Sequence, residues 1–252
     1  MIYLDEMVEY TKRYTHMEYE CLDVTAHLKP NSHIVNYDSV YLDNLLAWCV
    51  VNEATSGLGL PDTPDGYWIP IPVKLAEFVR GMPLWLTSVF IPDEKPIEDV
   101  AYHHKRIISG EWSKAKTLKT NVGRWMERRI PVPTMICESL TARVCGNRDE
   151  IARLLEAIKF LGKHRNVGYG EIDRWEVTPG EFDEDEILVI NNYLTHAIPI
   201  EYTGIEIDVS PSSVVGWTPP QWKVSLQSEG WPIGTLTKLD WFDRAPGELL
   251  NT

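Results

Sequence analysis

Residues 147–177 read NRDEIARLLEAIKFLGKHRNVGYGEIDRWEV, and this stretch decides the fold. Asn147 is a good helix N-cap, and Glu150, three residues later, can complete a capping box. Apolar residues then recur at the spacing of one helical face: Ile151, Leu154, Leu155, Ile158 and Leu161. Gly162 stands where a left-handed C-cap is expected. The pattern therefore predicts a helix that begins after Asn147 and ends at Gly162.

A basic loop with three glycines follows this helix and leads into an alternating stretch at residues 171–177, which predicts a strand. Glycines let backbone N–H groups approach a bound anion, and lysine and arginine side chains supply cations beside them. The loop is therefore expected to hold the backbone of a polyanion. Its candidate binding residues are Gly162, Lys163, His164, Arg165, Asn166, Gly168, Tyr169 and Gly170.

A purely structural explanation of the same loop is equally open. Gly162 can be only a C-cap, and Gly168 and Gly170 can be only turn residues. Lys163 and Arg165 would then complement the helix dipole. The loop is not a nucleotide P-loop, because no Lys-Ser or Lys-Thr follows the glycines and no GxGxxG opens the helix.

The remaining elements predict an α+β fold. Strands are expected at residues 21–28, 84–91 and 135–144, and an amphipathic helix begins at Leu42 and stops near Gly57. The proline-rich residues 67–73 suit an edge strand or an extended strap. Two strand–helix–strand units in series indicate a ferredoxin-like antiparallel sheet with two helices on one face. The strand that begins at Glu171 should pair beside the first.

This order also suggests a domain organisation. Residues 1–20 form an N-terminal arm, and residues 21–180 form the ferredoxin-like domain with a basic hairpin insertion at about 97–133. Residues 181–252 form an acidic, Trp- and Pro-rich region that is loop-rich, partly β and packed on that domain, with short strands expected at 187–189, 198–202 and 205–209. Its tryptophans could stack on bases, but packing within the region is favoured.

Composition places the protein among cytoplasmic globular proteins. The chain has 252 residues, of which 44% are hydrophobic, so it can bury a sizeable core. It contains no apolar run long enough for a membrane span, and the first residues do not resemble a standard signal peptide. The four cysteines form no CxxC pair and are expected to be reduced core thiols.

The net charge of −13 is unevenly distributed along the chain. Between residues 103 and 129 there are eight Lys or Arg residues against two Glu, whereas residues 181–252 contain twelve Asp or Glu against three Lys or Arg. The acidic run at 181–186 is expected to be a solvated loop. The basic middle is the part whose local field suits a polyanion. Its candidate RNA-binding residues are Lys105, Arg106, Lys114, Lys116, Lys119 and Arg124.

Three other chemistries fit the sequence less well than polyanion binding. The seven histidines show no metal-ligand spacing, so neither a metal nor another cofactor is expected. No nucleophile elbow or comparable catalytic motif is present. Metal-free RNA cleavage is conceivable, with His103 or His104 beside Lys105 as a general base. A His-His-Lys-Arg run is more typical of a basic surface, so no catalytic residue is assigned.

Several short motifs resemble proteins of the CRISPR-associated RAMP superfamily (repeat-associated mysterious proteins). Residues 162–170, followed by Trp175, look like the glycine-rich loop of that superfamily. The start of the first helix, LDNLLA at residues 42–47, is similar to that of the Cas-five-like subunit of type IV CRISPR systems. The segments IPIP (69–72), PLW (83–85) and PPQW (219–222) also resemble that group. The resemblance covers roughly residues 21–225.

The resemblance implies a non-catalytic subunit that binds the 5′ handle of the guide RNA. Such a subunit would cap the filament of backbone RAMP subunits in a type IV CRISPR effector ribonucleoprotein that serves antiviral defence. A large subunit would be a further partner, and the target nucleic acid would be contacted only indirectly. By position, residues 162–170 would carry the RNA loop, and the basic insertion would be a protruding thumb.

Two alternatives remain open at this point. The chain could be a RAMP endoribonuclease that processes precursor guide RNA with a histidine near 103–104. It could instead be a ferredoxin-like ligand-binding or regulatory domain whose glycine loop is only structural. Binding without cleavage, cleavage, or neither would distinguish the three functions.

Overall fold

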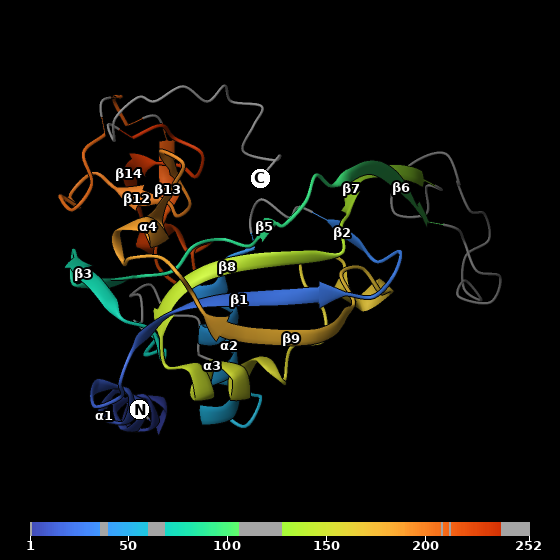
Figure 1. The fold of residues 1–252 in the computed structure, drawn as a ribbon. Helices are drawn as coiled ribbons and strands as arrows, with labels where there is room; N and C mark the ends of the chain where they lie inside the picture. The colour runs from blue at the N-terminus through green and yellow to red at the C-terminus, as the bar shows by residue number, and fades with distance from the viewer. Residues whose placement is uncertain are drawn as a thin grey trace, which may run out of the picture.

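A four-stranded antiparallel sheet lies at the centre of the molecule (Figure 1). The computed structural model describes residues 2–35, 40–59, 69–105, 128–207, 209–211 and 213–237. The strands of the central sheet follow the spatial order β5-β8-β1-β9. Their bounds are β1 Glu20–Leu28, β5 Ile91–Pro92, β8 Ser139–Gly146 and β9 Ile172–Pro179.

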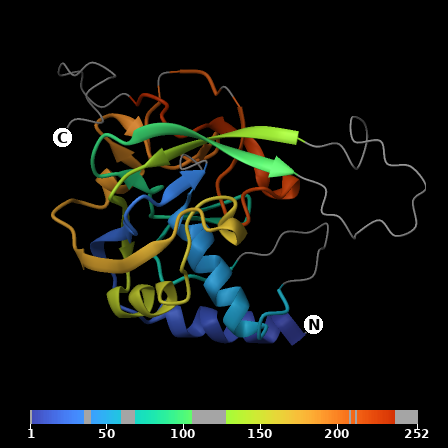
Figure 2. The same ribbon diagram turned by 90° about the vertical axis from the view of Figure 1, so that its right-hand side faces the viewer.

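Two helices connect these strands and lie on one side of the sheet (Figure 2). Helix α2 (Leu42–Ala54) comes between β1 and β5, and helix α3 (Arg148–Leu155) comes between β8 and β9. This is the β-α-β-β-α-β order of a ferredoxin-like fold, with the last strand beside the first. The predicted fold class is confirmed. The strand predicted after Glu171 also pairs with β1 as expected, with Ala26 opposite Trp175.

The main core fills the space between the sheet and the two helices. Strand β1 alternates as its sequence predicts, and its buried side chains are Leu22, Val24, Ala26 and Leu28. Helix α3 and the segment after it contribute the apolar face that the sequence predicts. Its residues Ile151, Leu154, Leu155, Ile158 and Leu161 are all buried. These residues belong to one continuous apolar cluster. Burial of this face stabilises the fold by roughly 1.5–3 kcal/mol for each large side chain.

Helix α3 is shorter than its sequence predicts. It ends at Leu155, and its C-cap is Glu156, so the expected C-cap role of Gly162 is wrong. The remaining apolar residues, Ile158 and Leu161, are buried from the turns that follow the helix. The apolar spacing in the sequence therefore continues past the end of α3, because the turns after the helix cover the same core.

The start of helix α3 confirms the predicted N-cap but not the capping box. The Asn147 side chain accepts the Glu150 N–H at 3.1 Å. The Glu150 carboxylate does not reach back, because it instead accepts hydrogen bonds from Tyr14 (3.1 Å) and Arg153 (2.8 Å). Burial raises the pKa of Glu150, but these donors and Arg13 outweigh that effect and lower the pKa overall. This network ties helix α1 (Ile2–Thr15), which forms most of the N-terminal arm, to α3.

Two predicted strands are interrupted in the structure. Residues 84–91 are not one strand, because β4 (Met82–Trp85) pairs with β3 (Leu75–Val79) and ends before β5 begins. Residues 135–144 bend at Cys137–Glu138, where the Glu138 carbonyl accepts the Leu28 N–H at 2.8 Å. The chain therefore leaves one strand, β7 (Arg128–Ile136), and enters β8.

The proline-rich segment is a strap within its described part, residues 69–73. Ile69, Ile71 and Val73 are buried in the main core, yet they belong to no strand. Val73 makes only an isolated bridge to Gly146. Prolines, which lack N–H groups, are compatible with this extended backbone outside a strand. Residues 67 and 68, at the start of the predicted segment, lie outside the described residues.

A long two-stranded ribbon extends from the central sheet on the right of Figure 1. It consists of β6 (Ile97–Lys105) and β7, which pair antiparallel along their whole lengths. The short strand β2 (His33–Val35) pairs with the base of β7, so the order is β2-β7-β6. Strands β6 and β7 of this ribbon form the first and last parts of the predicted basic insertion. Residues 106–127 between them lie outside the described residues.

The C-terminal region lies on the side of the central sheet opposite the helices (Figure 2). Its elements are α4 Asp185–Leu188, β10 Val189–Ile190, β11 Tyr193–Leu194, β12 Ile198–Pro199, β13 Ser213–Gly216, the 3-10 turn Val224–Leu226 and β14 Gln227–Trp231. The strand predicted at 187–189 is therefore mostly helix, that at 198–202 is two residues long, and no strand forms within 205–207. Short apolar runs do not distinguish these states.

Tryptophans of this region differ in their surroundings. Trp217 is buried in a second apolar core, together with Leu84 and Ile187. Trp222, in contrast, is 75% exposed. Packing within the region therefore explains the position of Trp217 but not that of Trp222. Helices of the described residues are too short or too polar to cross a membrane.

A buried polar pair links the first helix of the ferredoxin-like unit to the C-terminal region. Asp43, in the first turn of α2, and His196 are both fully buried, and His196 Nε2 lies 3.3 Å from Asp43 Oδ2. The Nδ1 of His196 donates to the Ala197 carbonyl at 2.9 Å, because a carbonyl oxygen can only accept. Gln221 donates to both Asp43 oxygens at 3.4 Å. The helix N-terminus also favours a carboxylate at this position.

We expect Asp43→Ala to lower the free energy of unfolding by about 3–5 kcal/mol, because it leaves a buried partner without its carboxylate. The double replacement Asp43→Leu/His196→Leu should cost less than the sum of Asp43→Ala and His196→Ala, since neither partner is then stranded. Urea titration of the wild type, the two single variants and the double variant measures these free energies of unfolding. Asp149→Ala, an exposed carboxylate in the first turn of α3, is the control and should cost below about 1 kcal/mol. Additive single and double losses would contradict the pairing.

Candidate nucleic-acid interface

The glycine loop (residues 162–170) is held against strand β2 by its backbone. The Gly170 N–H donates to the His33 carbonyl at 2.7 Å, and the Lys163 N–H donates to the Val35 carbonyl at 3.3 Å. Two further amides, of Val167 and Gly168, close the 3-10 turn Arg165–Val167. These four N–H groups are therefore already satisfied within the protein and are not available to the expected cradle of backbone N–H groups.

The three glycines of the loop serve different purposes. All have positive φ, at 77° for Gly162, 93° for Gly168 and 68° for Gly170. A Cβ on Gly162 would lie 2.8 Å from the Val35 carbonyl oxygen, and a Cβ on Gly170 would overlap the Leu161 carbonyl. A Cβ on Gly168 would meet nothing within 4 Å. Close packing thus requires glycine at 162 and 170, whereas backbone conformation alone favours it at 168.

The side chains of the loop, in contrast, are available to a ligand. Lys163, His164, Arg165 and Asn166 are all exposed. Within the described ranges, neither Lys163 nor Arg165 lies within ion-pair distance of a carboxylate. Cations that are not neutralised by the protein attract a polyanion most strongly. The loop therefore presents charge through side chains on a fixed backbone.

A cluster of aromatic rings joins the glycine loop to the ribbon. The ring of His103, on β6, lies 4.6 Å from that of His164 and 5.5 Å from that of Tyr169, measured between centroids. The His33 ring, on β2, lies 6.3 Å from Tyr169. The His103 Nε2 is buried and has no hydrogen-bond partner among the described residues. Three segments distant in sequence thus meet at one point.

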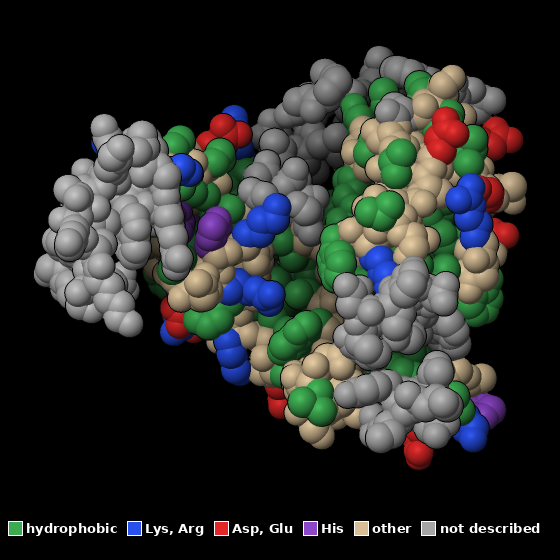
Figure 3. Space-filling view, turned by 180° about the vertical axis from the view of Figure 1, so that it is seen from behind, with side chains coloured by type: hydrophobic (Ala, Val, Ile, Leu, Met, Phe, Trp, Pro, Cys, Tyr) green, Lys and Arg blue, Asp and Glu red, His purple; other side chains and the backbone are tan. Residues whose placement is uncertain are grey.

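The ribbon carries further basic residues, of which His104 and Arg129 lie on the face turned away from this cluster. His104 and Arg129 face each other across β6 and β7, and Lys105 occupies the position opposite Arg128. The Arg129 guanidinium lies 3.8 Å from the Tyr102 ring centroid, which is a cation–π contact. Figure 3 shows Lys, Arg and His side chains on the surface beside this part of the molecule. Sequence analysis did not select His33, His103, Tyr102, Arg128 or Arg129 as binding residues, although the two arginines belong to the predicted basic segment.

Several predicted site residues cannot be placed. Residues Arg106, Lys114, Lys116, Lys119 and Arg124 lie outside the described residues. Lys105 is placed by its backbone only. The glycine loop and the base of the ribbon are therefore the part of the predicted interface that the structure brings together.

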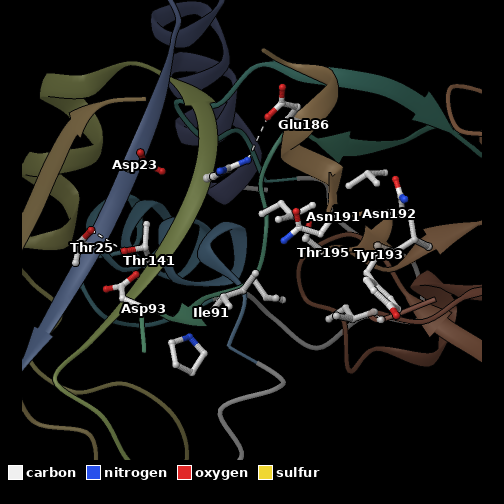
Figure 4. Close-up of a pocket in the computed structure, with 18 of the residues that line it drawn as sticks. Asp23, Thr25, Ile91, Asp93, Thr141, Glu186, Asn191, Asn192, Tyr193 and Thr195 are labelled. Atoms are coloured by element: carbon white, nitrogen blue, oxygen red, sulfur yellow. Dashed lines mark hydrogen bonds and ion pairs between the residues drawn. The ribbon is translucent and has the colours of Figure 1, made fainter. Parts of the chain in front are cut away.

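A separate cleft lies between the open face of the central sheet and the C-terminal region (Figure 4). Its volume is about 1030 Å3, and its charged lining residues are Asp23, Asp93, Arg143 and Glu186. Burial raises the pKa of Asp23, although the nearby Arg143 opposes this shift. Three carboxylates against one arginine disfavour a polyanion here. The charges of this cleft therefore favour the glycine loop over the cleft as the candidate nucleic-acid interface.

The acidic residues 181–186 beside this cleft are not only a solvated loop, as the sequence suggested. Glu184 accepts two hydrogen bonds from Lys74, both at 2.6 Å. Glu186 lies 3.5 Å from Arg143, whose guanidinium also covers the Phe182 ring at 4.6 Å. The segment is therefore anchored to the ferredoxin-like unit by charge. Among the described residues, no group of three His, Cys, Asp or Glu side chains is arranged to hold a metal ion.

Comparisons with known proteins give little beyond this description. No family model matches the chain, and no curated protein matches it. Among solved structures, it is similar to a chain of "Cryo-EM structure of the Type III-B Cmr-beta bound to cognate target RNA", with 14% sequence identity and a TM-score of 0.33. The match covers 70% of this chain and 66% of the other, which is just under two thirds of that chain's length.

The two kinds of glycine in the loop predict different costs of substitution. Gly170→Ala should lower the free energy of unfolding by at least about 3 kcal/mol, because the new methyl group overlaps backbone that cannot move freely. Gly168→Ala should cost only about 1–2 kcal/mol, since its cost is that of a left-handed backbone alone. Urea titration monitored by tryptophan fluorescence measures both. Equal losses would show that the loop does not pack on residue 161 as described.

Proposed function

We propose that this protein is a non-catalytic guide-RNA-binding subunit of a CRISPR ribonucleoprotein. One observation carries the proposal: the exposed cations Lys163 and Arg165, free of ion pairs in the described ranges, lie on a loop that is hydrogen-bonded to β2 and that the His103–His164 contact joins to strand β6 of the ribbon. Such a surface combines fixed positive charge with aromatic rings. Single-stranded RNA is recognised by this combination, because phosphates contact the cations and bases stack on the rings.

The finer assignment rests on the sequence resemblance. The motif of residues 42–47 is similar to that of the Cas-five-like subunit of type IV systems, and residues 162–170 are similar to the glycine-rich loop of the RAMP superfamily. We accordingly propose the 5′ handle of the guide RNA as the ligand and a filament of backbone RAMP subunits, with a large subunit, as the protein partners. Target nucleic acid would be reached only through the guide, and the assembly would act in the cytoplasm.

The unpaired cations lead to a quantitative prediction. Lys163→Ala/Arg165→Ala removes two phosphate contacts, each worth about 1.5 kcal/mol if charge-assisted, so affinity for a labelled repeat RNA should fall by roughly a hundredfold. The slope of log affinity against log salt concentration should become less negative by about 1.4, since each phosphate contact contributes about 0.7 for single strands. Fluorescence anisotropy at several salt concentrations measures both quantities.

A matched control removes two cations elsewhere. Lys12 and Lys159 are also exposed, and Lys12→Ala/Lys159→Ala changes the net charge by the same amount. This control should retain RNA affinity to within about threefold if the loop binds by local contact, since distant charges are screened beyond a Debye length of about 8 Å. If the loop variant binds like the wild type, the assignment of the glycine loop is wrong.

One observation favours a second candidate function, the cleavage of precursor guide RNA. His103 lies next to His164, on the proposed RNA-binding loop, and two histidines can act as general base and general acid. Their rings, however, are stacked at 4.6 Å with an interplanar angle of 35°. This spacing leaves no room for a phosphate between them, so the two imidazoles do not flank a scissile bond. Binding remains the first proposal.

Purified protein should therefore bind the repeat RNA without cutting it. We expect no product beyond that of a protein-free control after prolonged incubation with EDTA, as judged on a denaturing gel. His103→Ala should leave this result unchanged, and His104→Ala, whose side chain lies on the opposite face of β6, serves as the matched variant. Cleavage that is lost in His103→Ala while RNA binding persists would make the enzyme the better proposal.

A further inference from the structure

Strand β6 offers an open edge to another β-strand. It is the last strand of the sheet β2-β7-β6, and no strand of the described residues pairs with its outer side. The strand is nine residues long and, within its described side chains, carries exposed apolar groups, with Ile97 66% exposed and Val100 and Tyr102 each 46% exposed. A long edge strand with exposed apolar residues is a template for pairing with a further chain.

The hydrogen bonds of Asp99 show which backbone groups face the open edge. The Val100 N–H donates to the Asp99 side chain at 2.7 Å, so it points away from β7. Backbone groups alternate in direction along a strand, and the same alternate residues share one face. The outward-pointing backbone groups therefore belong to Glu98, Val100, Tyr102 and His104.

Two side chains of the other alternate set are already engaged. Asp99 lies 3.7 Å from His33, and His103 contacts the glycine loop through His164. The face that carries Glu98, Val100, Tyr102 and His104 points away from that loop and is exposed. This face is therefore the part of β6 that a partner strand would extend.

The order of residues along this face is complementary to itself. An acidic residue comes first, two apolar residues follow, and a basic residue comes last. If an antiparallel copy is centred on Ala101, Glu98 lies opposite His104 of the copy, and Val100 lies opposite Tyr102. In this register the outward-pointing backbone groups of both strands meet as hydrogen-bonded pairs. Opposite charges and apolar pairs directly across a ladder both stabilise it.

We propose that β6 is a homodimerisation strand that pairs antiparallel with β6 of a second copy, about a twofold axis at Ala101. The occupant is a second copy because the charge pattern fits its own reverse, and a C2 interface requires such self-complementarity. The pairing joins the two β2-β7-β6 sheets into one. It does not depend on RNA binding, so the dimer and the proposed function can fail separately.

Sedimentation velocity over a hundredfold range of protein concentration tests the dimer. The full chain without RNA should change from monomer to dimer as concentration rises. Glu98→Lys and His104→Glu each replace two attractive contacts with repulsive ones, so each should weaken dimerisation by about 5- to 30-fold. The double variant Glu98→Lys/His104→Glu restores opposite charges across the axis and should dimerise like the wild type. Glu94→Lys, at an exposed position before β6, is the control and should have no effect.

A second variant removes the backbone contact instead of the charge. Val100→Pro deletes an outward-pointing N–H, whose acceptor must change from the Asp99 side chain to a carbonyl of the second copy on pairing. The variant leaves the β6–β7 ladder intact and should abolish the dimer. Circular dichroism should show an unchanged fold. A chain that stays monomeric throughout the range overturns the proposal. So does a dimer that tolerates Val100→Pro, or one that both single charge variants leave intact.

Discussion

Strand β1 supports most of the structure, because it is hydrogen-bonded on both sides along nearly its whole length. It pairs with β8 on one side and β9 on the other, and its buried face carries the core on which both helices pack. The chain continues from β1 into β2, and the glycine loop precedes β9. Pairing of β1 with β9 therefore brings the loop beside β2, where the His33 and Val35 carbonyls hold it.

Sequence alone predicts the elements whose pattern is local. The alternation of β1 and the apolar face that begins at Ile151 were sufficient, because each element packs one face on a core. The bend at Cys137–Glu138 was missed because it contains neither glycine nor proline. The Leu28 N–H that fixes this bend comes from a distant strand, which no local pattern reveals.

The sequence indicates which loop forms the candidate interface but not how that loop is held. Spacing places glycines and cations in one loop, yet it does not distinguish a glycine that admits a ligand from one that packs on backbone. The structure shows that Gly170 packs, and that Gly168 does not. Likewise, nothing near His103 in sequence indicates its contact with His164, because the contact depends on how the ribbon folds over the loop.

The separation between paired strands has a consequence for synthesis on the ribosome. His27 of β1 contacts Glu176 of β9, a residue 149 positions later in the chain. At about 5–20 residues per second, translation of that interval takes roughly 7–30 seconds, during which one side of β1 has no partner. The nascent chain therefore exposes an apolar strand edge while most of the protein is being made. Protection of that edge by a chaperone during translation would follow directly from the order of the strands.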